Sequence, residues 1–176
     1  DMTSWVEQND DDIYAYLLAV IWNGSRLVSA GQYGIYTSTD EGTSWTETCS
    51  HDHFLFDICW SGSRFVAVGS ILQHSVSGDY TVFSSKDGIK WDTLVDINSD
   101  LKGVVYGDNQ YVAVGSKDIL CSKDGITWEN KVSENLYLND VAFSNHQFVA
   151  VGEGGLILTS VSDNQAGNKK EEETGN

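Results

Sequence analysis

The stretch STDEGTSW at residues 38–45 recurs in a shorter form as SKDGIKW at residues 85–91 and SKDGITW at residues 122–128. Each copy places a serine, an aspartate and a glycine ahead of a tryptophan. Serine and aspartate side chains satisfy backbone N–H groups in tight turns, and glycine supplies a positive φ. The three copies therefore predict three equivalent turns in a chain built from repeats.

Four longer segments around these turns align without a gap. They are LLAVIWNGSRLVSAG (17–31), LFDICWSGSRFVAVG (55–69), LKGVVYGDNQYVAVG (101–115) and LNDVAFSNHQFVAVG (138–152). Each begins with Leu, has an aromatic residue at its sixth place and ends with Gly, and a polar turn separates two apolar runs. This pattern is typical of a β-hairpin. The second run is apolar at successive positions, so both of its faces must be covered.

Two further short strands are expected after each hairpin. The third lies at residues 35–37, 81–83, 119–121 and 156–158, and the fourth starts at the tryptophan of each turn. Four strands in a unit of about 37 to 46 residues match one blade of a β-propeller. We therefore predict an all-β fold, a β-propeller of four-stranded antiparallel blades with four repeats, here called repeats 1 to 4, at about residues 14–49, 54–95, 101–132 and 137–160.

The fourth repeat lacks a tryptophan of its own, and the missing part lies at the other end of the chain. Asp1 stands four residues before Trp5, as Asp87 stands before Trp91. The N-terminus therefore looks cut, and we expect the N-terminal strand at residues 4–8 to pair with the last blade and close a propeller domain of residues 1–163. Residues 164–176 are predicted to form a disordered acidic tail. Three arrangements stay open: a closed four-bladed ring, an open fragment of a larger ring, and a homodimer that completes an eight-bladed ring.

The motif at residues 38–45 resembles the Asp-box, also called the bacterial neuraminidase repeat. The longer unit is similar to the propellers of photosystem II assembly factors, and the resemblance covers about residues 1–163. It implies that each box lies at the outer hairpin between the third and fourth strands, away from the usual ligand face. We therefore expect a structural role for the box residues, which are Ser38, Asp40, Gly42, Trp45, Ser85, Asp87, Gly88, Trp91, Ser122, Asp124, Gly125, Trp128, Asp1 and Trp5.

Composition narrows the class of partner and of activity. The net charge of −16 and the lack of a Lys/Arg cluster argue against nucleic acid and against an anionic membrane surface. The sialidase chemistry of the resembling family needs three arginines, whereas this chain has only Arg26 and Arg64. A glycosidase with two carboxylates stays open, although no acidic pair stands in an apolar setting. We expect no catalytic residues and no cofactor.

Cys49, His51 and His53 fall on one side of an extended strand because side chains alternate with a period of two. Such a trio could ligate zinc. No other repeat carries a similar trio, so we favour a polar connection between blades and predict no metal site. The odd count of three cysteines leaves the compartment open, with a bacterial-type, secreted or cell-surface setting slightly favoured.

One loop departs from the repeat. The segment at residues 71–80 is about eight residues longer than its counterparts, and in propellers such loops gather on one face, where a binding loop can grow. We expect ligand contacts from Tyr33, His51, His53, His74 and Tyr80. The predicted function is a non-catalytic binding or scaffolding propeller that recognises a protein or a glycan on its loop face. The alternative is a fragment of a carbohydrate-active enzyme that lacks its other blades.

Overall fold

The computed structural model describes residues 4–8, 13, 15–71, 80–97, 100–134 and 136–161. In this part the chain forms three antiparallel sheets, in agreement with the predicted all-β class. The first sheet has six strands: β1 (Leu17–Trp22), β2 (Leu27–Ser38), β3 (Thr46–Trp60), β4 (Phe65–Ile71), β5 (Tyr80–Ser85) and β6 (Asp92–Ile97). The second has four: β7 (Leu101–Gly107), β8 (Gln110–Gly115), β9 (Asp118–Ser122) and β10 (Glu129–Ser133). The third has three, β11 (Leu138–Ser144), β12 (Gln147–Gly152) and β13 (Ile157–Thr159), with the short 3₁₀ helix η1 (Glu153–Gly155) before β13.

The predicted hairpins are confirmed in all four repeats, where β1 pairs with β2, β3 with β4, β7 with β8 and β11 with β12. In the first turn, the Asn23 side chain accepts hydrogen bonds from the backbone N–H groups of Ser25 and Arg26, both at 2.9 Å. Gly24 follows with a φ of 98°. These local contacts explain why the polar residues between the apolar runs reverse the chain.

Repeats 1 and 2 share one sheet, which differs from the separate four-stranded blades expected from the sequence. β2 joins the predicted second and third strands of repeat 1, and β3 joins its fourth strand to the first strand of repeat 2. The register of the β2–β3 pair shifts between Gln32 and Gly34, where Tyr33 has a φ of 71°. The chain therefore bends at an irregularity of the sheet instead of leaving it, because strand pairing continues on both sides of the bend.

The core lies in layers between consecutive repeats. One buried cluster joins repeats 1 and 2 through Val28, Ala30, Ile35, Leu55, Ile58, Phe65, Ala67 and Phe83. A second joins repeats 2 and 3 through Cys59, Val66, Val68, Val82, Leu101, Val104, Tyr111, Ala113 and Leu120. A third joins repeats 3 and 4 through Val112, Val114, Leu138, Val141, Phe148 and Ala150. Along β4, successive side chains enter alternate clusters, which explains the continuous apolar run.

The glycine that ends each hairpin segment is required by a close backbone approach. A Cβ atom placed on Gly69 would stand 1.8 Å from the carbonyl oxygen of Phe54, and one on Gly115 would stand 1.8 Å from that of Asp100. Gly31 meets the carbonyl of Tyr16 in the same way, at 2.0 Å. The repeated glycine thus lets the segment that enters each repeat pass directly over its second strand.

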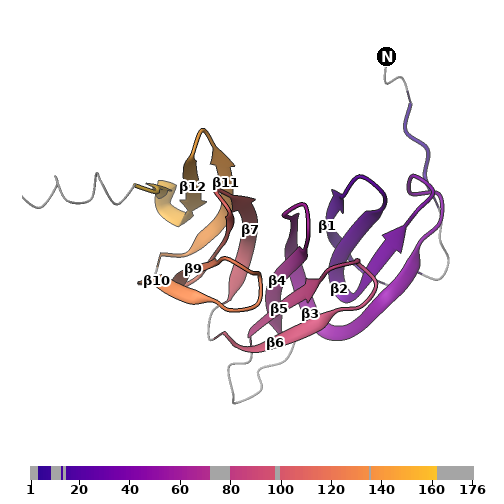
Figure 1. The fold of residues 1–176 in the computed structure, drawn as a ribbon, viewed down its shortest axis with the longest axis horizontal. Coiled ribbons are helices and arrows are strands. Elements are labelled where there is room, and N and C mark those ends of the chain that lie inside the picture. Colours follow the sequence, from indigo (N-terminus) through magenta and orange to yellow (C-terminus); the bar gives the residue numbers. More distant parts are fainter. Residues whose placement is uncertain are drawn as a thin grey trace, which may run out of the picture.

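The repeats follow one another along an open arc, with β1 near one end and β11–β13 at the other (Figure 1). Residues 4–8 form no strand, and Trp5 is 91% exposed. The expected pairing of the N-terminal strand with the last blade is therefore not formed in this structure. Asp1, His74 and the tail at 164–176 lie outside the described residues. No helix in the described part of the chain is long and apolar enough to cross a membrane.

Candidate functional site

The three box turns are held by hydrogen bonds within each turn. In the first box, Asp40 Oδ1 accepts from the hydroxyl of Ser38 at 2.8 Å and from the backbone N–H of Ser44 at 2.9 Å. Its Oδ2 accepts from the Ser44 hydroxyl at 2.7 Å. The Ser44 bonds, followed by the bond from Ser38, lower the pKa of Asp40 to about 2. The carboxylate is therefore ionised at neutral pH and occupied as an acceptor.

The second and third boxes repeat this geometry. Asp87 Oδ1 accepts from the backbone N–H groups of Ile89 and Lys90, both at 2.9 Å, and Asp124 Oδ1 accepts from those of Ile126 and Thr127, both at 2.8 Å. Those backbone bonds lower the pKa of both aspartates. The hydroxyls of Ser38, Ser85 and Ser122 accept from the N–H groups of Gly42, Gly88 and Gly125 at 2.8 to 2.9 Å.

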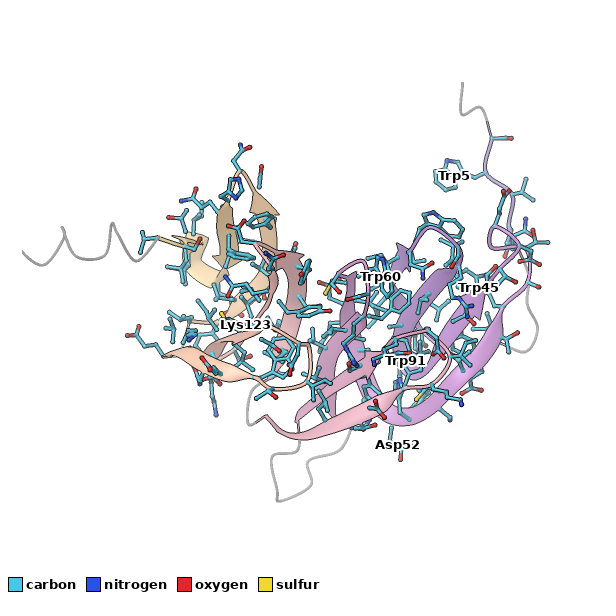
Figure 2. The ribbon with its side chains drawn as sticks, in the orientation of Figure 1. Trp5, Trp45, Asp52, Trp60, Trp91 and Lys123 are labelled. Atoms are coloured by element: carbon cyan, nitrogen blue, oxygen red, sulfur yellow. The ribbon has the colours of Figure 1, made fainter. Side chains whose placement is uncertain are left out.

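The tryptophans end the boxes, but their indole groups are not all bonded alike. Trp45 Nε1 donates to the carbonyl oxygen of Gly42 at 3.1 Å, and Trp91 Nε1 donates to that of Gly88 at 3.2 Å. Trp128 Nε1 is buried with no hydrogen-bond partner in the described residues, while its ring packs against the cluster between repeats 2 and 3. Trp91 packs against the cluster between repeats 1 and 2 (Figure 2).

In the second and third boxes, the glycine touches the repeat that precedes it. A Cβ on Gly88 would lie 3.1 Å from Val28 Cγ2 and 3.4 Å from Arg26 Cδ, both in repeat 1. A Cβ on Gly125 would lie 2.8 Å from Val66 Cγ2 and 3.0 Å from Arg64 Cδ, both in repeat 2. The two arginines thus lie beside the box of the following repeat, which accounts for their equivalent places in the sequence.

The pair His51 and His53 faces inward. The two rings lie 4.9 and 5.4 Å from the ring of the buried Phe83, between centroids, and 5.6 Å from each other. Burial, followed by the neighbouring His53, lowers the pKa of His51 to about 4, and burial lowers the pKa of His53. Both rings are therefore neutral at pH 7. No group of three His, Cys, Asp or Glu side chains in the described part of the chain is placed to hold a metal ion.

The loop face is defined here by two sets of segments: the connections at 32–34, 116–117 and 153–155, and the residues that enter each repeat. Backbone bonds join the two sets: Gln32 donates to the carbonyl oxygen of Tyr16 at 2.9 Å, and Glu153 donates to that of Tyr137 at 3.1 Å. Tyr16 is 73% exposed, and Tyr33 and Tyr137 are each 47% exposed. Of the predicted contact residues, His74 and the side chain of Tyr80 lie outside the described part of the structure.

Tyr16 and Tyr137 were missed by the sequence analysis. They stand directly before the first Leu of repeats 1 and 4, one position ahead of the aligned segments. The equivalent residues in repeats 2 and 3 are Phe54 and Asp100. An extension of the alignment by one residue would have shown that three of the four entry positions are aromatic.

Asp57 was also missed; it is a partly buried carboxylate on β3 that reaches into the neighbouring repeat. Its Oδ1 accepts from the backbone N–H of Ile58 at 2.8 Å, and its Oδ2 accepts from that of Val104, in repeat 3, at 2.8 Å. Burial raises the pKa of Asp57, and the two backbone bonds oppose the rise. Because one oxygen accepts from its own repeat and the other from repeat 3, Asp57 braces repeat 2 against repeat 3.

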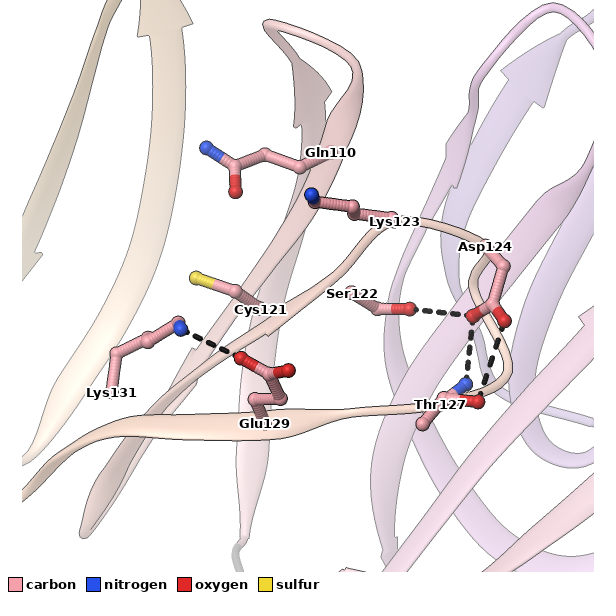
Figure 3. Close-up of a pocket in the computed structure, with 8 residues that line it drawn as sticks. All are labelled: Gln110, Cys121, Ser122, Lys123, Asp124, Thr127, Glu129 and Lys131. Carbon is pink, nitrogen blue, oxygen red and sulfur yellow. Dashed lines mark hydrogen bonds and ion pairs between the residues drawn. The ribbon is translucent and has the colours of Figure 1, made fainter.

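A hollow of about 220 Å³ lies on repeat 3 (Figure 3). It is lined by Gln110, Cys121, Ser122, Lys123, Asp124, Thr127, Glu129 and Lys131. The ammonium of Lys131 lies 2.7 Å from Glu129 Oε2, and Asp124 is bonded within its own turn. Gln110 is the residue of repeat 3 equivalent to Arg26 and Arg64. In repeats 1 and 2 the box of the following repeat packs beside that arginine, so the hollow lies next to the equivalent place on repeat 3.

No protein-family model matches the chain, and no curated protein matches it by sequence. Solved structures do resemble it. A computationally designed protein, Ika4, superposes with a TM-score of 0.66 at 11% identity over 89% of this chain and 98% of its own. YCF48 from Cyanidioschyzon merolae gives a TM-score of 0.62 at 16% identity over 85% of this chain. The chain has a β-propeller fold.

The likeness to longer propellers covers only part of them. This chain spans 54% of the YCF48 chain, and 53% of YCF48 in its structure bound to D1 peptide, where the identity is 18% and the TM-score is 0.59. An ancestral GH74 enzyme superposes with a TM-score of 0.60 at 14% identity over 82% of this chain but only 25% of its own. At these identities the likeness concerns the fold alone.

Proposed function

We propose that this chain is a non-catalytic propeller module that binds a protein or a glycan on its loop face. The observation that carries the proposal is the pair Tyr16 and Tyr33, which are exposed on two segments joined by the bond from Gln32 to the carbonyl of Tyr16. Exposed tyrosines on a rigid scaffold supply large contact area at a low cost in conformational entropy. They are enriched at recognition surfaces for that reason.

The proposal includes four blades, one for each repeat, with the box turns as structural staples between them. The occupied carboxylates of Asp40, Asp87 and Asp124 support this role, because each is used up by its own turn. The contacts of Gly88 and Gly125 with the preceding repeat support it further. In this proposal the segment at Trp5 becomes the fourth strand of a last blade, as the box pattern of residues 1–5 indicates.

The competing function is that of a carbohydrate-active enzyme fragment. Two-carboxylate hydrolysis needs one acid with a raised pKa and a free oxygen near a second carboxylate. Asp57 has the raised pKa, but its two oxygens are bonded to Ile58 and Val104. The binding module is therefore the better supported function.

The test is a comparison of two variants on arrays of oligosaccharides and of peptides. The double variant Tyr16→Ser/Tyr33→Ser is expected to lose about tenfold or more of the binding shown by the natural chain. Ile89→Ser is the matched control, since Ile89 is also 47% exposed but lies in a box turn. Equal binding by the double variant would refute the assignment of the site. Hydrolysis of aryl glycosides by the natural chain would favour the enzyme.

A further inference from the structure

One set of repeat positions always faces the preceding repeat. These are the first, fourth and eleventh places of the aligned segment, and in repeats 2 to 4 they are buried: Leu55, Ile58, Phe65, Leu101, Val104, Tyr111, Leu138, Val141 and Phe148. In repeat 1 the first and fourth places are Leu17 and Val20, which are 39% and 61% exposed. Trp22, at the aromatic sixth place, is 51% exposed. We call Leu17, Val20 and Trp22 the N-terminal end face.

A second set of positions always faces the following repeat. In repeat 2 it includes Val68 and Val82, both fully buried against repeat 3. The equivalent residues of repeat 4 are Val151 and Ile157, which are 43% and 65% exposed. We call Val151 and Ile157 the C-terminal end face. The two end faces thus correspond to the two halves of the contact that the chain makes three times internally, and neither meets its other half within the described residues.

A polar contact adds direction to this match. In repeats 2, 3 and 4, the backbone N–H of the residue at the fourth place of the aligned segment donates to an aspartate. Ile58 and Val141 donate to the aspartate of their own repeat, Asp57 and Asp140, at 2.8 Å. Val104 follows a glycine and donates to Asp57 of the preceding repeat at 2.8 Å.

Repeat 1 has Ala19 at the third place, so it has no carboxylate there for the N–H of Val20. A preceding repeat with an aspartate at that place would provide one, as repeat 2 does for repeat 3. Repeat 4 has such an aspartate, Asp140, whose Oδ1 accepts from Val141 as Asp57 Oδ1 accepts from Ile58. Apolar side chains and backbone polarity therefore both fit repeat 4 as the neighbour that precedes repeat 1.

We propose that the N-terminal end face of one copy packs on the C-terminal end face of a second copy, with Asp140 of the second copy accepting from the N–H of Val20. Two such contacts, related by a two-fold axis, close a ring of eight repeats. The second copy is the occupant because the two end faces of one chain lie at opposite ends of the arc (Figure 1). The Trp5 segment of each copy then lies next to β13 of the other, whose only partner strand in the described residues is β12.

The net charge of −16 on each copy opposes association at low ionic strength, since like charges repel over about a Debye length. The ring is therefore stabilised by salt. This dependence distinguishes an apolar contact with a few polar bonds from an association held by opposite charges, which salt would weaken.

The experiment is sedimentation equilibrium of residues 1–176 at low and moderate salt. The natural chain is expected to show twice the 19.4 kDa of one copy, more completely at the higher salt. Val20→Asp and Ile157→Asp each place a charge in one end face, and each is expected to weaken dimer formation about 100-fold or more. Ile89→Asp, at an exposed position in a box turn, is the matched control and remains dimeric.

Mixing the two end-face variants tests the pairing of unlike faces. Val20→Asp retains an intact C-terminal end face, and Ile157→Asp retains an intact N-terminal one, so the mixture is expected to form an open heterodimer through one contact. Circular dichroism and thermal unfolding of each variant check that the fold is kept. A natural chain that sediments as a monomer overturns the proposal, and so does a dimer that only one of the two substitutions disrupts.

Discussion

The glycine of the third box offers a sharp test of how the repeats pack. Gly125 and Gly62 both have a positive φ, 71° and 92°, so alanine imposes backbone strain of about 1–2 kcal/mol at either site. A Cβ on Gly62 meets nothing within 4 Å, whereas one on Gly125 meets Val66 at 2.8 Å, Arg64 at 3.0 Å and Tyr111 at 3.1 Å. Overpacking of this kind adds about 1–3 kcal/mol.

We therefore expect Gly125→Ala to lower the free energy of unfolding by about 1–3 kcal/mol more than Gly62→Ala does. In a chain of this size the difference is roughly 2–12 °C in melting temperature. Urea unfolding followed by tryptophan fluorescence, with thermal unfolding beside it, measures both variants. Equal losses would refute the claim that the third box is wedged against the preceding repeat, because only the shared backbone strain would then act.

Two further predictions concern buried polar groups. Asp57→Ala leaves the backbone N–H groups of two strands without their acceptor, so it is expected to lower the free energy of unfolding, measured in urea, by about 2–4 kcal/mol. A loss no larger than that of Asp140→Ala would contradict the bracing role of Asp57. His51 has a pKa lowered to about 4 in the folded chain, so the unfolded chain binds the proton more readily and stability falls as pH drops from about 6.5 towards 4. Allowing for partial exposure of the ring, the loss is about 1–2 kcal/mol, and His51→Phe should flatten this part of the pH–stability curve.

Much of the fold could be predicted because the repeat carries its own physical reasons. The alternate burial of Val66 and Ala67 in different clusters follows from an apolar run that must be covered on both faces. The glycine at position 69 follows from the carbonyl of Phe54 that passes over it. These features depend on neighbours within one repeat or in the next, so they recur with the sequence.

The parts that could not be predicted depend on contacts that do not repeat. The inward placement of His51 and His53 depends on Phe83, which belongs to a strand about 30 residues away. The alternation along β3 placed both rings on one side but did not say which side was the core. The role of Asp57 depends on the glycine before Val104, since an aspartate there would have bonded that amide locally.

The ends of the arc mark the limit of what these 176 residues determine. The box pattern predicts that the segment at Trp5 closes the propeller, yet Trp5 is 91% exposed and residues 4–8 form no strand. Pairing of that strand needs an edge, and the only described edge next to the fourth repeat lies across the arc from it (Figure 1). A second copy would present this edge without any change to the three contacts between consecutive repeats.

Small-angle X-ray scattering of residues 1–176 at moderate salt tests whether the two end faces are unused halves of the contact between repeats. We predict the scattering of a closed ring of two copies, with twice the mass of one 19.4 kDa chain and a distance distribution that shows a central channel. Scattering from a single open arc with the mass of one chain would contradict the account.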